Sequence, residues 1–233
     1  MARLRHWLAV AVMLGMTPAA HATERGFTVT DFDRIRIDGP YQIEITTGRS
    51  TTAKASGDRD AVERVSLQVQ GRTLMIRPDR SIWGANGAAS AGPVTIRLSM
   101  GELRTLMLYG SGSVRIDRAR GPRLELMIQG SGRLEIGEVA TDRLDIGMTG
   151  SGAAKLAGHV KLLNAVVRGS AALDGGALLA NDLVLNTETA SEVTLGARTS
   201  AKIQSTGAGN TSIIGRAACT VTATGAGGVS CGD

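Results

Sequence analysis

The stretch LMLYGSGSVRIDRARGPRLELMIQGSGRLEIGEVATDRLDIGMTGSGAAKL, residues 106–156, decides the fold of this chain. The tripeptide Gly-Ser-Gly occurs in it three times, twenty residues apart, between short runs that alternate apolar and polar residues. A fixed period of this length with strand-type alternation indicates a stacked repeat rather than a globule with one centre. The repeated turn residues are Gly110, Ser111, Gly112, Gly130, Ser131, Gly132, Gly150, Ser151 and Gly152.

The repeat continues to the C-terminus in one register. With the first glycine of each triplet set to zero, the apolar residues stand at even offsets, −6, −4, −2, +4 and +6, and related triplets begin at Gly169, Thr189, Gly207 and Gly225. Side chains alternate between the two faces of a strand, so even offsets are predicted to point inward and odd offsets outward. We therefore predict an all-β chain in which seven rungs stack as parallel strands.

The first 22 residues have the pattern of a secretory signal. Arg3 and Arg5 precede an apolar segment, and Ala20-His21-Ala22 forms a small-x-small cleavage site. We expect cleavage after Ala22; an uncleaved N-terminal anchor is the alternative. The predicted organisation is a signal peptide at 1–22 and a single solenoid domain at 23–233, with its repeats from about 103. No later segment is long and apolar enough to span a membrane, so we expect a periplasmic, surface or extracellular location.

Composition excludes several classes of function. Removing the two leader arginines leaves 24 basic against 21 acidic residues, and these charges are interspersed. Nucleic-acid binding needs a clustered basic face and is not expected. His159 is the one histidine beyond the leader, which disfavours zinc. For calcium the nearest cluster is Asp31, Asp33 and Asp38, although solvated strand-end charges are the preferred interpretation. No cofactor is predicted.

Cys219 and Cys231 occupy the −6 and +6 positions of the last rung, both predicted to point inward. In an oxidising compartment they are expected to form a disulfide that closes the C-terminal end of the stack. Two buried thiols are the alternative, since packed sheets lie about 10 Å apart and a disulfide needs Cα atoms within about 7 Å.

Residues before the repeats are predicted to cap its first end. Residues 31–46 fit the same frame around Gly39, as an early rung or hairpin whose tip carries Tyr41. A short helical turn is possible within 54–64, and 66–77 reads as two strands around Gln70-Gly71. Residues 78–92 form a loop with Trp83 at its centre, and 94–98 is expected to be a strand that leads into the repeats.

One outward column supports the stacking. Position +5 alternates in sign on successive rungs, so neighbouring side chains would pair and fix the register. The residues are Arg115, Glu135, Lys155 and Asp174.

Together, these residues resemble the head GIN domain family, described as adhesins of auto-transporter type and otherwise of unknown function. The resemblance spans about 27–233 and rests on the Ile-x-Ile pairs of 32–45, on 74–76 and 94–98, and on the repeated Leu-x-Leu and Gly-Ser-Gly units. It implies a right-handed β-helix-like fold in an exported bacterial protein, and it implies no catalytic residues.

Two hypotheses for function remain. The Gly-Ser-Gly units lack the helix and the Lys-Ser/Thr pair of a phosphate loop, so they are interpreted as turns. A non-enzymatic adhesin or envelope scaffold would bind an envelope glycan or protein, or associate with itself, with Trp83, Tyr41 and Tyr109 as candidate exposed contacts. The alternative is a polysaccharide-active lyase or hydrolase, whose best carboxylate pair would be Glu125 and Asp145 on adjacent rungs.

Overall fold

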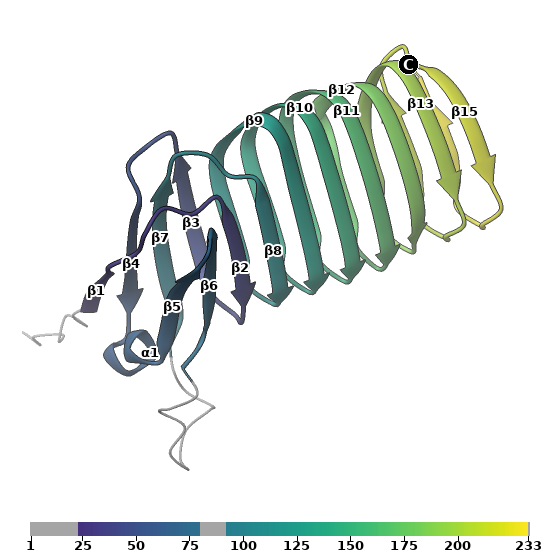
Figure 1. Ribbon diagram of the computed structural model, residues 1–233. Helices are drawn as coiled ribbons and strands as arrows, with labels where there is room; N and C mark the ends of the chain where they lie inside the picture. Colours follow the sequence, from purple (N-terminus) through teal and green to yellow (C-terminus); the bar gives the residue numbers. More distant parts are fainter. Residues whose placement is uncertain (1–22, 80–91, 233) are drawn as a thin grey trace, which may run out of the picture.

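The computed structural model describes residues 23–79 and 92–232. It is a β-solenoid of about six turns (Figure 1), as the repeat predicts. The predicted signal peptide and Trp83 lie outside the described residues. The elements are β1 (Thr23–Phe27), β2 (Arg34–Asp38), β3 (Gln42–Thr47), β4 (Thr52–Gly57), α1 (Arg59–Glu63), β5 (Val65–Gln70), β6 (Thr73–Pro78), β7 (Val94–Met100), β8 (Thr105–Gly110), β9 (Ser113–Gly130), β10 (Arg133–Gly150), β11 (Ala153–Gly169), β12 (Ala172–Thr189), β13 (Val193–Ser205), β14 (Thr211–Ile214), β15 (Ala218–Ala223) and β16 (Val229–Cys231).

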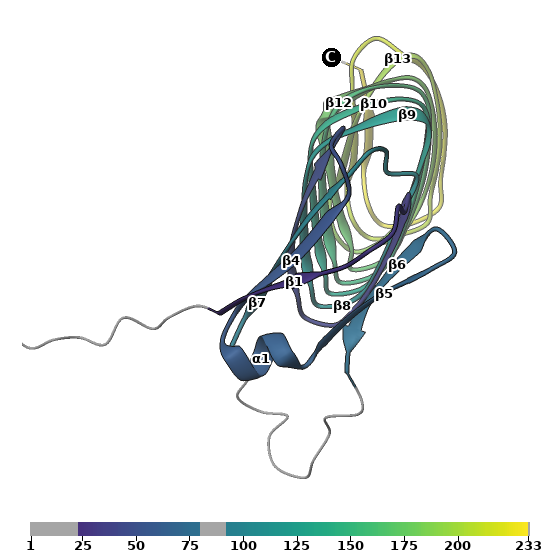
Figure 2. The same ribbon diagram turned by 60° about the vertical axis from the view of Figure 1, so that its left-hand side comes forward.

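The long strands β9 to β13 pair in parallel, and equivalent residues of successive coils lie side by side. Ile116 pairs with Ile136, and Ile136 with Leu156, so the predicted register is confirmed. Pairing also continues around the return edges that the sequence suggested were linkers, with register irregularities such as the one between Ile136 and Val139. Each of β9 to β12 therefore covers both flattened sides of its coil (Figure 2).

The Gly-Ser-Gly turns stack as predicted, and so closely that a side chain has no room at Gly130 or Gly150. Gly130 and Gly150 have φ values of 113° and 114°, which L side chains rarely adopt. A Cβ on Gly150 would stand 2.5 Å from the carbonyl oxygen of Gly130. The amide of Ser151 donates to that same oxygen at 2.9 Å. The turn therefore holds adjacent coils together through its backbone, and the serine side chains remain exposed.

The core is a column of stacked apolar layers between the two flattened sides. The inner position at −4 is at most 3% exposed in every coil from Leu106 to Ile203. Burial of this kind contributes roughly 25 cal/mol for each Å² of apolar surface removed from water. Successive coils share these layers, so each coil is stabilised mainly by its immediate neighbours.

The N-terminal strands do not stack in chain order. The first coil, β2 with β3, pairs with β8 and β9 on one side and with β6 and β7 on the other. The strand expected at 94–98 is present as β7, but it lies one layer farther out, beside β3, before the chain returns to β8 and the repeats. Outside this layer, β4 pairs antiparallel with β7, β1 pairs antiparallel with β4, and β5 pairs antiparallel with β6. Together with α1, they form the predicted cap (Figure 1).

A buried carboxylate joins the cap to the first coil. Asp33 is 5% exposed and accepts a hydrogen bond from Nε of Arg72 at 2.8 Å. The guanidinium of Arg104, just before β8, lies 3.8 Å from the same carboxylate, and that of Arg34 lies 3.9 Å away. A buried charge needs such partners to offset its desolvation. Arg72, in the turn between β5 and β6, and Arg104 thereby link the cap to the stack through Asp33.

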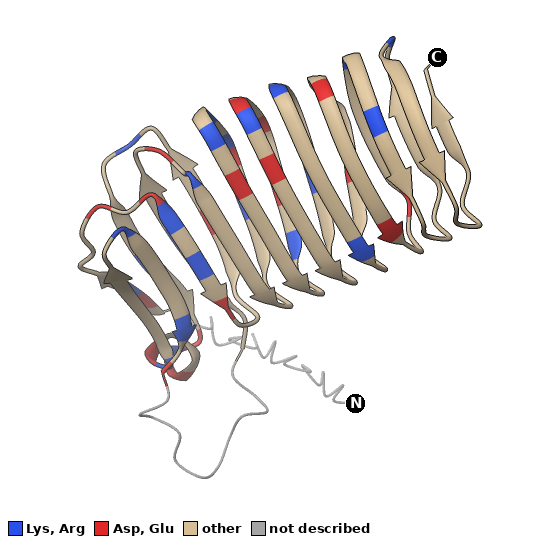
Figure 3. Cartoon of the chain, turned by 45° about the vertical axis from the view of Figure 1, so that its right-hand side comes forward, with Lys and Arg blue, Asp and Glu red and all other residues tan. Residues whose placement is uncertain are grey.

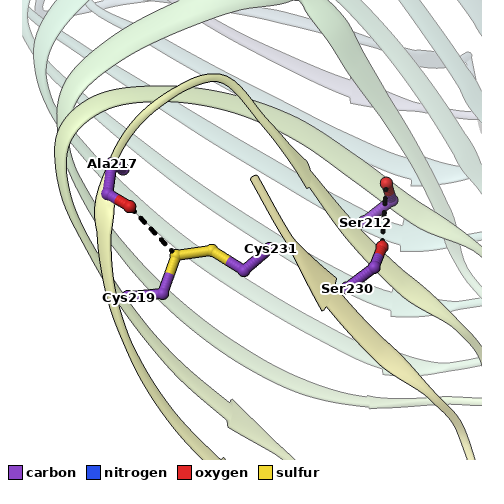
Figure 4. The surroundings of a disulfide bond; sticks show 5 residues. All are labelled: Ser212, Ala217, Cys219, Ser230 and Cys231. Carbon is purple, nitrogen blue, oxygen red and sulfur yellow. Dashed lines mark hydrogen bonds between the residues drawn. A yellow bond between two sulfur atoms is a disulfide. The ribbon is translucent and has the colours of Figure 1, made fainter. Parts of the chain in front are cut away.

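The predicted disulfide is confirmed at the other end (Figure 4). Cys219 of β15 and Cys231 of β16 are bonded, with their Cα atoms 6.6 Å apart. Both side chains are half-buried and pack against the last apolar layer. The bond therefore links the two flattened sides of the final coil.

Candidate functional site

A charged ladder runs along one outer side of the stack. The predicted column at +5 is paired as expected: Arg115 contacts Glu135 at 3.0 Å and Lys155 contacts Asp174 at 3.9 Å. The ladder extends into the cap, where Arg97 of β7 contacts Glu44 of β3 at 3.0 Å. Exposed pairs of this kind contribute less than about 1 kcal/mol each, so the ladder sets register and surface charge more than stability.

A shallow groove of about 610 Å³ lies on the same side, across β3 and β9 to β12. The column at +3 forms its floor, and the charged ladder flanks it. The floor residues are small or neutral except for one arginine: Gln42, Ser113, Arg133, Ala153 and Ala172.

Arg133 is the free cation of this groove. Within residues 23–79 and 92–232, its exposed guanidinium has no ion pair or hydrogen bond, whereas the lining residues of the ladder, from Glu44 to Asp174, pair with neighbouring strands. The small side chains of Ala153 and Ala172 leave the space beside it open. The sequence interpretation missed this feature, although the +3 column contains the signal: one arginine among small residues. The groove therefore offers an unpaired positive charge to an acidic or hydroxyl-bearing ligand.

Tyr41 is not available to a ligand, so its predicted exposure is wrong. Its side chain is 7% exposed, and burial raises the pKa of its hydroxyl to about 12. The ring packs against Gly39, where a Cβ would stand 2.8 Å from the ring. Tyr41 has the even offset +2 from Gly39, so the repeat frame itself places it inward.

Tyr109 is half-buried on the opposite side of the solenoid from the groove. The guanidinium of Arg36 lies 4.6 Å from its ring centroid, and its hydroxyl donates to Sδ of Met127 at 3.9 Å. Arg36 is held in turn by Asp38 at 3.0 Å. These contacts orient the ring and leave part of it accessible, so its role in ligand binding stays a prediction.

Glu125 and Asp145 are neighbours on β9 and β10, as the register predicts, but Asp145 is not a free carboxylate. Its side chain is 20% exposed and lies 2.9 Å from both Arg123 and Arg143. Burial opposes its ionisation, but hydrogen bonds from Arg143 and Asn164 and the nearby positive charges outweigh that effect, and its pKa is lowered. A general acid needs a raised pKa, so Asp145 is not suited to protonate a leaving group.

The described residues contain no group of three His, Cys, Asp or Glu side chains that could hold a metal ion. His159 lies exposed on β11. The aspartates considered as a calcium cluster have separate partners: Asp31 accepts from Thr51, Asp33 is held by arginines, and Asp38 pairs with Arg36. In residues 23–79 and 92–232, no helix is long and apolar enough to cross a membrane.

The sequence matches a family model over residues 31–217, and that family is described as “putative auto-transporter adhesin, head GIN domain”. The chain belongs to this family. The resemblance seen in the Ile-x-Ile and Gly-Ser-Gly units is thereby confirmed for the greater part of the head GIN domain. Comparison with curated proteins gives no match.

Solved structures share the fold of this head GIN domain. A “putative adhesin” from Bacteroides fragilis superposes with a TM-score of 0.83 at 21% identity, covering 92% of this chain and 99% of its own. A “putative lipid binding protein” from Parabacteroides distasonis has a TM-score of 0.71 at 21% identity, covering 90% and 96%. A “putative adhesin” from Parabacteroides merdae has a TM-score of 0.66 at 16% identity, covering 90% and 95%. At such identities the likeness shows the fold alone.

Proposed function

We propose that this head GIN domain is exported and acts as a non-enzymatic, adhesin-like module that binds an envelope ligand in the groove over β3 and β9 to β12. The observation that carries the proposal is the unpaired Arg133 on a floor of small side chains, beside a ladder whose charges are paired. The adhesin description of the family supports a binding role. The predicted signal at 1–22 supports export.

The chemistry of the groove favours an acidic glycan over a protein segment. A carboxylate or sulfate can accept hydrogen bonds from the guanidinium of Arg133. The amide of Gln42 and the hydroxyl of Ser113 can exchange hydrogen bonds with sugar hydroxyls along the same floor. The groove crosses several parallel strands, so it suits an extended polymer better than a small molecule.

The experiment compares the whole chain with Arg133→Gln on an array of acidic and neutral envelope glycans. We expect binding to acidic glycans, reduced at least about tenfold by Arg133→Gln, since hydrogen bonds to charged groups contribute about 1.5–3 kcal/mol. The control is Arg198→Gln, which removes another exposed arginine without a described partner, on β13 and outside the groove. Equal binding by the two variants would remove the groove from the proposal. Capture of a protein instead of a glycan would change the ligand class.

The polysaccharide-active alternative is weaker because Asp145 is held between two arginines. If the chain nevertheless cleaves a polysaccharide, substitution of both Glu125 and Asp145 with Ala should abolish turnover while the far-UV spectrum stays unchanged. Turnover retained in that double variant would exclude this pair.

A further inference from the structure

The last coil, at the C-terminal end of the solenoid, has unpaired strand edges. Within the described residues, β15 pairs only with β13, and β16 pairs only with β14, so both strands have a free edge (Figure 1). The inner column at −4 ends at Val221, which is 43% exposed, although its neighbour in that column, Ile203, is fully buried. Each earlier coil is covered at this position by the next one. Within the described residues, no layer covers this end of the core.

The two ends of the stack differ in how they are protected. At the N-terminal end, α1 and the antiparallel strands β1 and β5 form a cap with charged residues, including Glu24, Arg25 and Asp60. At the C-terminal end, residues 217–232 contain no charged side chain and no proline. Charges and prolines are the usual protection of an exposed strand edge. The strands at this end are uncharged in Figure 3.

We propose that the C-terminal coil is a self-association surface, on which a second copy of the chain docks end to end through a two-fold axis. In this arrangement β15 would pair antiparallel with β15 of the other copy, and β16 with β16. A register with Val221 opposite its symmetry mate places inner residues opposite inner residues, as continuous layers require. An edge without charges meets its own copy without repulsion.

A second copy fits this surface better than a single foreign strand would. The end presents two free edges on opposite sides of one core, and another identical coil matches both edges and the layer between them. With six residues in β15 and three in β16, the end face of the coil measures roughly 20 Å by 10 Å, so the two strand pairings and the shared apolar layer carry the contact rather than a large buried area. Because the N-terminal end is capped, association stops at two copies.

The experiment measures the mass of the whole chain by sedimentation equilibrium across a concentration series, and its maximum dimension by small-angle scattering. We expect a dimer about twice as long as the monomer. Val221→Lys places two ammonium groups opposite each other across the axis and should weaken the dimer at least about a hundredfold, since opposed like charges cost several kcal/mol. The control Ile214→Lys changes a side chain of equal exposure, 42%, on the lateral surface of β14 and should leave the dimer intact.

Several outcomes would overturn the proposal. These are a monomer throughout the concentration series, a dimer whose length does not increase, a Val221→Lys dimer as strong as that of the parent chain, and equal disruption by the two lysine variants. Because Val221→Lys could disturb the last coil, the folding of this variant is checked by far-UV circular dichroism. A second variant, Thr222→Lys, is measured in the same way. Thr222 points outward from the same edge strand, so Thr222→Lys leaves the core unchanged. In this register the new lysine faces Thr220 of the other copy and lies diagonally from its own symmetry mate, so it should weaken the dimer less than Val221→Lys.

Discussion

Replacing Gly150 with alanine tests the close stacking of the Gly-Ser-Gly turns. Its φ of 114° costs an L residue about 1–3 kcal/mol. The new Cβ would also stand 2.5 Å from the carbonyl oxygen of Gly130, in backbone that cannot rotate away. Overpacking of this kind costs about 1–3 kcal/mol more. We therefore expect Gly150→Ala to lower the free energy of unfolding by about 4 kcal/mol.

Gly147 on the same strand is the matched control. A Cβ at Gly147 meets nothing within 4 Å, and its φ is not positive. Gly147→Ala should therefore be neutral or stabilise by up to about 1 kcal/mol. Thermal unfolding followed by circular dichroism measures both variants, and about 4 kcal/mol corresponds to a melting temperature roughly 8–16 °C lower for a chain of this size. If the two variants melt within about 2 °C of each other, the turns are not packed as described.

Three further outcomes follow from the same contacts. Substituting both Cys219 and Cys231 with Ala removes a cross-link over twelve residues, so hydrogen exchange in the last coil should accelerate by up to the equivalent of about 3 kcal/mol while the earlier coils stay protected. Asp145 has a folded-state pKa below its unfolded value. Its contribution to the free energy of unfolding is therefore present above about pH 4 and is lost as the pH falls through the folded-state pKa. In an acid titration, Asp145→Asn should lose less stability over that range than the parent chain. Glu135→Lys places a third positive charge between two basic neighbours and should destabilise by about 1–2 kcal/mol, a loss that 1 M salt reduces in urea unfolding.

The inner columns made most of this fold predictable from the sequence. Glycines at a fixed period and apolar residues at even offsets specify parallel coils, because a slip of one residue would expose every inner side chain. The same frame correctly predicted that the +5 residues of successive coils lie side by side, and it placed Cys219 and Cys231 in one coil. It also implied that Tyr41, at offset +2, points inward. The general tendency of tyrosine to lie near a surface was a weaker guide than this offset.

The order of the N-terminal layers could not be derived in the same way. The inner residues of 35–37, 74–76 and 106–108 are equally apolar, and each segment fits beside either of the others. Nothing in their pattern specifies that β2 lies between β6 and β8. That order depends on tertiary contacts such as Asp33, which is held by arginines from three separate segments. Arg133 was missed for a related reason. Its neighbours in the groove have ion-pair partners and Arg133 has none among the described residues, and these contacts are not visible in the sequence.

The solenoid separates the residues that fold the chain from those that would bind a ligand. Inner columns must stay apolar, whereas outer columns vary without breaking the stack, so structures at 16–21% identity share the fold and say nothing of the ligand. One unpaired arginine in an open groove is expected to bind weakly on its own. Two chains joined at their C-terminal ends would carry two such grooves on one rigid body, and a polymer that reaches both gains affinity without any new contact. If both proposals are correct, Val221→Lys should weaken binding to a long acidic glycan while leaving binding to a short fragment unchanged, a difference that neither proposal predicts alone.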